Sequence, residues 1–324
     1  MVSSDEVIWM YRLLLGREPE NPDVIAVHTT HASLLDMLRS FLRSQEFRDR
    51  SAALELFPIA TSGYPLDQAP PMDIAGARSD ESSMWRAVAA SWESFGQSDP
   101  YWSVLTDDRW RMSKMTDVDK IEAFYATGQH DLERLGSWLR RAGLKEKTNG
   151  VCVEYGCGVG RVTEWLARRY RKVRAFDISK SHIDAAQRRF ASKGVKNVEF
   201  VHVKGPADLD ALGRCDMFFS TLVLQHNPPP IIRSILKVAL RGLNRSGIAF
   251  FQVPTYMADY RFNAREYVDM KRDGAFMEMH CIPQSEVFQL LQEANCILRE
   301  VQPDGFIGNH GIWISNTFLA GRLS

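Results

Sequence analysis

The segment that most constrains the fold is VCVEYGCGVGR, residues 151–161, which predicts a strand, a glycine-rich loop and the start of a helix in direct succession. The apolar run around Glu154 predicts a buried strand, and three glycines follow it at alternate positions: Gly156, Gly158 and Gly160. Glycine is needed where the backbone turns sharply or where a ligand lies directly against it. Arg161 stands where the dinucleotide-binding fingerprint needs its last glycine, and the Gly-Lys-Ser/Thr of a phosphate-binding P-loop is absent.

Short β-rich runs alternate with helical patterns after residue 150. The expected strands are 151–155, 173–177, 198–203, 215–220, 247–253, 296–301 and 313–321. The expected helices are 161–170, 180–193, 229–242 and 285–296. This alternation predicts an α/β fold with a parallel sheet and crossover helices, and such sheets bind ligands at the carboxyl ends of their strands.

An acid followed by Gly-x-Gly-x-Gly at the end of a strand resembles motif I of the class I S-adenosylmethionine-dependent methyltransferases. The resemblance covers about residues 124–320 and implies a Rossmann-like, seven-stranded class I methyltransferase sheet. It also implies S-adenosylmethionine as the methyl donor and S-adenosylhomocysteine as the product. The glycine loop would then hold the methionine end of the cofactor, and Glu154 would face its ammonium group.

The end of the second expected strand supplies a candidate ribose-binding carboxylate. Asp177 lies 17 residues after Gly160, where a carboxylate can accept two hydrogen bonds from a ribose diol. Ile178, the next residue, is a further candidate for contact with the cofactor. The alternative role for Asp177 is an acid at a helix N-terminus, stabilised by the helix dipole.

Two later segments extend the resemblance. VKGPADLDAL, residues 203–212, lies where such enzymes contact adenine, and Asp208 and Leu209 are the candidates there. CDMFFSTLVLQHNPPP, residues 215–230, resembles the family's segment after the fourth strand. In that segment Leu222 and Gln225 would flank the methionine portion of the cofactor.

Methyl transfer is an in-line displacement, and an alcohol acceptor usually also needs a general base. Histidine is the first candidate, because its pKa lies near neutrality. His226 follows the fourth strand, and His280 lies in an insertion, residues 254–283, that we expect to form part of a lid. The alternative for both is a hydrogen-bonded structural histidine. Asp259 and Glu278 are further candidates as bases or as groups that bind the substrate.

Aromatic residues with polar groups precede the expected sheet. Tyr101 and Trp102, within DPYWSVLTDDRW at 99–110, are candidates for contact with the substrate. Tyr125 is a candidate for closing over the cofactor. The alternative is that these rings pack the core of a helical cap.

Three segments point to the acceptor by resemblance. WSVLTDDRW, the later FYATG and MHCIPQSEVFQLL resemble methyltransferases encoded with bacterial surface-glycan biosynthesis enzymes. YRLLLGREPENPDV with FLRSQEF near the N-terminus resembles a small helical domain of unknown function found on bacterial glycosyltransferases and methyltransferases. The resemblance implies O-methylation of a sugar hydroxyl, on a nucleotide sugar or a glycan intermediate.

Composition shifts divide the chain into four segments. Residues 1–56 predict a helical accessory domain, and residues 57–83, rich in Pro, Gly, Ser and Asp, predict a linker. Residues 84–145 predict a helical cap, an N-terminal extension of the catalytic domain. Residues 146–324 predict the cofactor-binding domain itself.

Charge and cysteine content exclude several classes of protein. The 40 basic and 40 acidic side chains leave no basic excess for a nucleic-acid partner, and the basic run at 168–174 reads as a solvated helix end. The sequence contains no run of 18 apolar residues, so no transmembrane helix is expected. The N-terminus lacks the basic start of a signal peptide. The five cysteines are odd in number and form no C-x-x-C pair, which argues against a disulfide framework or a zinc site and suits a reducing cytoplasm.

Three rival functions stay open at this point. The first is N-methylation of an amino sugar or another small amine, which needs little help from a base. The second is a non-catalytic scaffold, with the N-terminal domain binding a glycan-assembly partner or a second copy of the chain. Dinucleotide-dependent oxidoreduction is the third, and Arg161 disfavours it.

Overall fold

The computed structural model describes residues 2–53, 72–76, 78–270, 274–307 and 313–323. The chain divides into two compact units, Met1–Asp67 and Gln68–Ser324. Each unit has an apolar core of its own. Most of the predicted linker at 57–83 lies outside the described residues, so the predicted boundary at residue 56 stays a prediction.

The N-terminal unit is helical over its described residues. Its elements are α1 (Ser4–Met10), the π-helical turn η1 (Tyr11–Leu15), α2 (Pro22–Thr29), α3 (Leu34–Leu42) and α4 (Gln45–Ala53). Apolar side chains at helical spacing, Val7, Tyr11 and Leu15, pack with Met37 and Phe41 to form its core. This unit therefore has the helical structure that its sequence pattern predicts.

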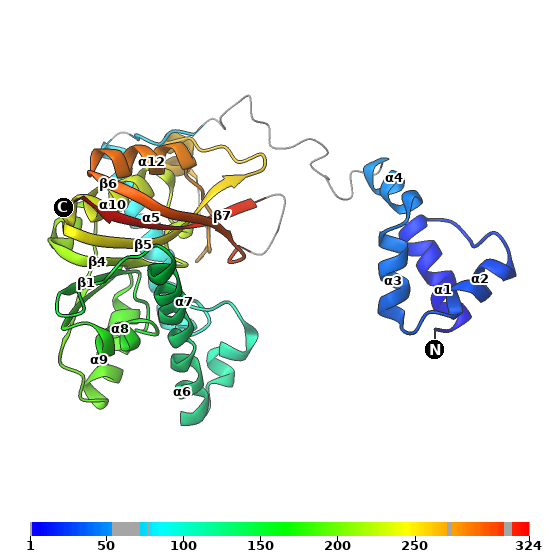
Figure 1. Ribbon diagram of the computed structural model, residues 1–324, viewed down its shortest axis with the longest axis horizontal. Coiled ribbons are helices and arrows are strands. Elements are labelled where there is room, and N and C mark those ends of the chain that lie inside the picture. The colour runs from blue at the N-terminus through cyan, green and yellow to red at the C-terminus, as the bar shows by residue number, and fades with distance from the viewer. Residues whose placement is uncertain (1, 54–71, 77, 271–273, 308–312, 324) are drawn as a thin grey trace. The chain divides into compact units, whose positions relative to one another are not determined.

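The larger unit is built on a seven-stranded sheet (Figure 1). Its strands are β1 (Val151–Tyr155), β2 (Lys172–Asp177), β3 (Val198–His202), β4 (Cys215–Ser220), β5 (Leu243–Met257), β6 (Cys296–Asp304) and β7 (Trp313–Arg322). Their order is β3-β2-β1-β4-β5-β7-β6, with β7 antiparallel to β5 and β6 and the other neighbours parallel. The predicted Rossmann-like sheet of seven strands is confirmed.

Helices cover both faces of this sheet. They are α5 (Arg78–Ser98), α6 (Val118–Ala126), α7 (Gly128–Arg141), α8 (Thr163–Arg169), α9 (Lys180–Ser192), α10 (Pro229–Gly242), α11 (Ala264–Asp269) and α12 (Gln284–Glu293). Short 3-10 turns lie at 108–110, 112–114, 206–212 and 224–226. Figure 1 shows α5, α10 and α12 on one side of the sheet and α7, α8 and α9 on the other.

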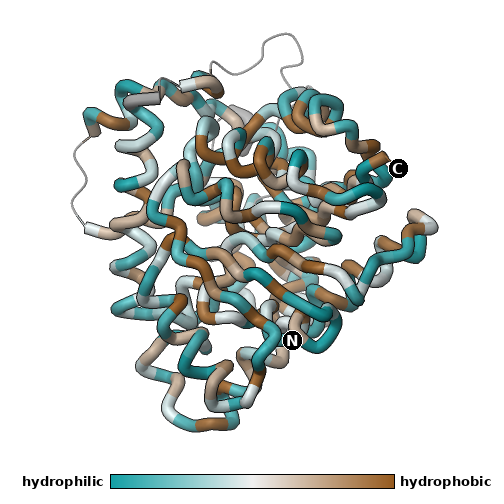
Figure 2. Tube along the Cα trace, turned by 90° about the vertical axis from the view of Figure 1, so that its left-hand side faces the viewer, coloured by the Kyte–Doolittle hydropathy of each residue, from teal (hydrophilic) through white to brown (hydrophobic). Residues whose placement is uncertain are grey.

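Successive side chains along each strand point to opposite faces of the sheet, and both faces are apolar, so helices cover both. Phe218 and Phe219 are neighbours on β4, yet they belong to the two different apolar clusters that flank the sheet. Phe250 and Phe251 on β5 divide in the same way. Strands buried on both faces therefore have the nearly continuous apolar runs that the sequence shows. Figure 2 shows hydrophobic and hydrophilic residues interleaved along the chain, as expected of helices with one buried face.

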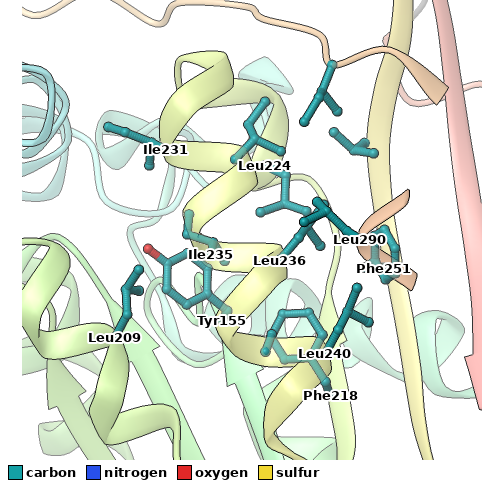
Figure 3. Close-up of a cluster of buried hydrophobic side chains, with 14 of the residues drawn as sticks. Tyr155, Leu209, Phe218, Leu224, Ile231, Ile235, Leu236, Leu240, Phe251 and Leu290 are labelled. Carbon is teal, nitrogen blue, oxygen red and sulfur yellow. The ribbon is translucent and has the colours of Figure 1, made fainter. Parts of the chain in front are cut away.

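Helix α10 forms the centre of the core on one face of the sheet (Figure 3). Its Ile235, Leu236 and Leu240 are fully buried and lie beside Tyr155 of β1 and Phe218 of β4. Full burial of one such aliphatic side chain contributes about 1.5–3 kcal/mol. This packing holds β1 and β4 together, and the segments that follow these two strands carry most of the candidate site.

Two boundaries differ from the sequence expectations. Helix α5 begins at Arg78, inside the predicted linker, whereas the predicted helical cap starts at residue 84. Strand β5 continues to Met257, into the predicted insertion at 254–283, because its pairing with β7 extends as far as Trp313. The rest of the insertion contains the short helix α11.

The described helices, metal-binding residue types and cysteines show the following features. None of their helices combines the length and the apolar character needed to cross a bilayer. None of their His, Cys, Asp and Glu side chains forms a group of three or more that could hold a metal ion. All five cysteines are buried and unpaired.

Candidate functional site

A cavity lies at the carboxyl ends of β1, β2 and β4, where sheets of this kind bind ligands. Its volume is about 780 Å³, including the space at its mouth. Six of the residues predicted to contact the cofactor line it: Glu154, Gly156, Gly158, Asp177, Ile178 and Leu222. The fold therefore brings three separate sequence segments together around one cavity.

The glycine loop follows β1 in a conformation that other residues rarely adopt. Gly156, Gly158 and Gly160 have φ angles of 80°, 52° and 87°. A Cβ atom at Gly156 would lie 2.1 Å from the side chain of Val223. The amides of Gly156 and the next residue both donate to the carbonyl oxygen of Phe176, at 2.8 and 2.9 Å. These bonds fix the loop against the end of β2.

Asp177 ends β2 and is 8% exposed. Its Oδ2 accepts a hydrogen bond from the Gly158 amide at 2.7 Å, and its Oδ1 accepts one from the Ser179 amide at 2.9 Å. Each carboxylate oxygen has two lone pairs, so both can accept another bond. The carboxylate therefore organises the loop and can still bind a diol in the cavity.

Glu154 lies on β1 and is almost completely buried. The Thr163 hydroxyl donates to its Oε2 at 2.5 Å. Burial raises the pKa of Glu154 to about 8, since few water molecules can stabilise its charged form. A buried carboxyl of this kind is suited to a positively charged ligand group.

Leu222 follows β4 with a φ of 63°, which is unusual for a residue with a side chain. Its amide donates to Gln252 Oε1 at 2.9 Å, and Gln252 Nε2 donates to Gln225 Oε1 at 2.9 Å and to Ser315 Oγ at 2.6 Å. This buried network holds the segment after β4 in place. Gln225 belongs to the network and does not line the cavity.

Four more residues that were predicted to contact the cofactor lie away from the cavity wall. Leu209 packs into the core beside α10, and Asp208 Oδ2 accepts from the Lys204 amide at 2.7 Å. Tyr125 is buried, and its hydroxyl donates to the Val159 carbonyl at 2.9 Å. A Cβ atom at Gly160 would lie 2.7 Å from the Phe190 ring, so this glycine allows close packing. Direct contact of these residues with the cofactor stays a prediction.

His226 is held by hydrogen bonds on both ring nitrogens. Its Nδ1 donates to the Glu278 carbonyl oxygen at 2.8 Å, which leaves Nε2 as an acceptor 3.1 Å from Gln225 Nε2. Burial lowers the pKa of His226 to about 4, so the ring is neutral at physiological pH. The ring contacts Trp92, with 5.1 Å between centroids, but His226 itself does not line the cavity.

His280 and Glu278 lie together in a second hollow of about 1060 Å³. His280 Nε2 is 3.1 Å from the Glu278 carboxylate, and the Tyr260 hydroxyl is 2.7 Å from Nδ1. Tyr267 also donates to this carboxylate, at 2.5 Å. Asp259 is exposed and lines neither cavity. The structure therefore brings His280 to Glu278 but brings neither to the cavity beside Asp177, and their roles stay predictions.

Tyr101 and Trp102 pack against protein groups. Tyr101 makes an edge-on contact with Phe124, with 5.1 Å between ring centroids. The Arg111 guanidinium lies over the Trp102 ring, 3.6 Å from its centroid. Neither residue lines the cavity, although the neighbouring Ser103 does. Contact of Tyr101 and Trp102 with a substrate stays a prediction.

Several cavity residues were missed by sequence reasoning. Val88 and Trp92 reach the cavity from α5, and Arg161, His182 and Asn227 reach it from the larger unit's loops and helices. The apolar face of the helix that contains Trp92 is visible in the sequence, but its position beside the cavity is not. Trp92 and Val88 show that α5 forms part of the cavity wall.

The family comparison assigns the segment around this cavity. Residues 152–247 match the family described as "Methyltransferase domain". These residues run from β1 through β4 to the start of β5 and include the glycine loop and Asp177. This segment is a methyltransferase domain. Its sheet order is that of the class I fold, whose cofactor is S-adenosylmethionine.

The curated relatives match this chain over short stretches. One is a tRNA/tmRNA (uracil-C(5))-methyltransferase of Nitratiruptor sp., 40% identical over 75 residues, or 23% of this chain. Another is an uncharacterized protein of Rickettsia prowazekii, 30% identical over 112 residues, or 34% of this chain. The match spans about a fifth of the length of either relative, 20% in each case.

Solved structures of methyltransferases align with this chain at low identity. Magnesium protoporphyrin IX methyltransferase of Synechocystis, with bound S-adenosylhomocysteine, has a TM-score of 0.48 and 17% identity, covering 74% of this chain and 99% of that one. An S-adenosylmethionine-dependent methyltransferase of Clostridium acetobutylicum has a TM-score of 0.43 and 15% identity, covering 61% and 91%.

The residues around the cavity fit the cofactor of the methyltransferase domain. Asp177 offers a carboxylate for a diol, and Glu154 offers a buried carboxyl for an ammonium group. His182 is 1% exposed, its Nε2 contacts the Ser103 hydroxyl at 2.9 Å, and its Nδ1 has no partner within the described residues. A buried ring nitrogen without a protein partner is expected where a bound ligand or water completes its hydrogen bonding.

Proposed function

We propose that the chain binds S-adenosylmethionine in the cavity beside Asp177 and transfers its methyl group to a small-molecule acceptor. The observation that carries this proposal is the convergence of Glu154, the glycine loop and Asp177 on one cavity of the methyltransferase domain. The bound cofactor supplies an electrophilic methyl group on a sulfonium.

The residues of the cavity act by binding and positioning. Asp177 accepts the ribose hydroxyls, and the glycine loop lets the backbone lie directly against the cofactor. Glu154 binds the ammonium group at the other end of the loop. Trp92 and Val88 line the cavity from α5, and their apolar side chains exclude water from the reacting groups.

The proposed acceptor is a sugar hydroxyl, on a nucleotide sugar or a surface-glycan intermediate of a bacterium. Its support is the resemblance of the segments around Trp102 and His280 to methyltransferases of glycan biosynthesis. We further propose that the N-terminal unit binds an assembly partner or a second copy of the chain. Five unpaired cysteines support a reducing, cytoplasmic location.

A second candidate reaction is methylation of an amine. The observation that favours it is the position of the two candidate bases: neither His226 nor His280 lines the cofactor cavity, and both rings are fully hydrogen-bonded. An unprotonated amine attacks a sulfonium methyl without a general base, whereas an alcohol usually needs one. Comparison of matched hydroxyl and amino-sugar acceptors, with S-adenosylhomocysteine formation as the readout, decides between the two.

Calorimetric titration tests whether the chain binds the proposed cofactor. S-adenosylmethionine and S-adenosylhomocysteine should bind the wild-type chain with micromolar affinity, and Asp177→Ala should weaken both at least about tenfold. Asp184→Ala, which removes a partly exposed acid on α9, is the matched control and should bind as wild type does. No heat from either ligand with the folded wild type would overturn the proposal and favour a non-catalytic scaffold.

A further inference from the structure

Arg161 lies directly after the glycine loop and lines the cofactor cavity, although it is only 5% exposed. Helix α7 packs directly on its backbone: a Cβ atom at Gly128 would lie 2.3 Å from the Arg161 carbonyl oxygen. The position of this arginine is therefore fixed by the packing of α7 against the start of α8. Its side chain is part of the built wall of the cavity.

The guanidinium group uses only some of its donors within the protein. Nη1 donates to Asp131 Oδ2 at 2.7 Å and contacts the Thr127 hydroxyl at 3.4 Å. Nε is buried, and neither Nε nor Nη2 has a hydrogen-bond partner in the part of the chain that the structure describes. A guanidinium carries five N–H donors, and leaving a buried donor without a partner is costly. Asp131 thus orients the group while donors remain for a ligand.

Arg161 places a cation, and Glu154 a carboxyl that an adjacent ammonium group would ionise, on the wall of the same cavity. Glu154 accepts a hydrogen bond from Thr163, and Arg161 donates one to Asp131, so the protein holds each of the two groups separately. A ligand group that carries both an ammonium and a carboxylate matches this pair. Guanidinium–carboxylate hydrogen bonds are among the strongest that proteins make.

We propose that Arg161 binds the carboxylate of the cofactor's amino-acid portion, opposite the ammonium group bound by Glu154. This inference rests on the proposed function. It assigns to Arg161 a role in selecting a cofactor that carries a complete amino acid. It also explains why the cavity wall keeps a buried cation beside a glycine loop that has no phosphate to bind.

The test compares two ligands that differ by the carboxylate alone. Decarboxylated S-adenosylmethionine keeps the sulfonium and the amine, so the ratio of its Kd to that of S-adenosylmethionine isolates the carboxylate contact. The wild-type ratio should be at least about ten. In Arg161→Met the ratio should fall to between about one and two, because S-adenosylmethionine loses affinity and its decarboxylated analogue does not.

Two further variants keep the test decisive. Arg161→Met leaves the Asp131 carboxylate buried without its cation, and this variant could fail to fold for that reason. The double variant Arg161→Met, Asp131→Asn removes both charges and replaces the single variant in that case. Arg168→Met removes an exposed cation of α8 and should keep the wild-type ratio. A wild-type ratio near one, or an unchanged ratio in the Arg161 variants, would overturn the inference alone. Absence of binding by the wild type would overturn the proposed function with it.

Discussion

The imidazole of His226 donates from Nδ1 to the backbone carbonyl of Glu278, which lies 52 positions further along the chain, with 2.8 Å between the two atoms. This bond ties the segment after β4 to the insertion that follows β5. It also assigns the proton of the neutral ring to Nδ1, because a carbonyl can only accept. His226 thereby joins two parts of the larger unit, and its titration should affect stability.

Acidification should destabilise the protein through His226. The folded chain keeps the ring neutral because burial lowers its pKa from 6.5 to about 4, whereas the unfolded chain binds a proton below pH 6.5. The stabilising contribution is thus complete above about pH 6.5 and is lost as the pH falls toward 4, by up to roughly 3 kcal/mol. Denaturant unfolding at a series of pH values measures how the free energy of unfolding depends on pH. His226→Gln should flatten this dependence, and His130→Gln, at a side chain 84% exposed, should not.

Cofactor binding should release a proton from Glu154. Burial raises the pKa of this carboxyl to about 8, so it is largely protonated at pH 7 in the free protein. An ammonium group bound beside it favours the charged form and lowers that pKa, and affinity should therefore rise between pH 6 and pH 8. Titration calorimetry in buffers of different ionisation enthalpy should count up to about one proton released at pH 7. Glu154→Gln should release none; equal release by the variant would contradict the assignment.

Gln252→Leu should lower the free energy of unfolding by about 3 kcal/mol. The substitution leaves the half-buried amide of Leu222 without its acceptor and removes the donor to the buried Gln225 and Ser315. It should also weaken cofactor binding, because Leu222 lines the cavity. Chemical denaturation measures the first effect and ligand titration the second. Gln289→Leu, on the exposed face of α12, should change neither; a stable Gln252→Leu protein would show that the network is dispensable.

Gly156→Ala should abolish cofactor binding. The new Cβ would meet Val223 at 2.1 Å on a backbone with a φ of 80°. Gly194→Ala is the matched control, because Gly194 has a φ of 68° but no neighbouring atom within 4 Å. The control should cost only the strain of the left-handed conformation, about 1–2 kcal/mol. Thermal unfolding and titration of both variants separate the clash from the strain; normal binding by Gly156→Ala would refute this account of the loop.

Local patterns in the sequence were sufficient to predict the strands of the sheet and the central residues of the candidate site. The apolar runs at β1, β2, β4 and β5 predicted buried strands because strands covered on both faces need apolar side chains on both. The glycine loop and Asp177 follow their strands directly, and parallel strands end at the same edge of a sheet. Their convergence on one cavity therefore follows from chain order and strand direction.

The sequence could not show what surrounds these groups. His226 was placed correctly after β4, but its distance from the cavity depends on Glu278 and Trp92, which are distant from it in the chain. Helix α5 was visible as an apolar face, yet its role as a cavity wall depends on packing with α9, α10 and α11. Such contacts have no local signal, because no spacing between residues encodes them.

The sequence by itself determined the order of strands and helices, the turn at the glycine loop and the carboxylate at the end of β2. Each of these follows from side-chain periodicity or backbone conformation within a few residues. Only the tertiary structure decided which polar groups are buried, which hydrogen bonds they make and which of them reach the cavity. Burial and hydrogen bonding depend on segments that are distant in the chain and meet only when the sheet and its helices pack. This is why Arg161, a single residue beside a glycine in the sequence, becomes a candidate ligand-binding group in the fold.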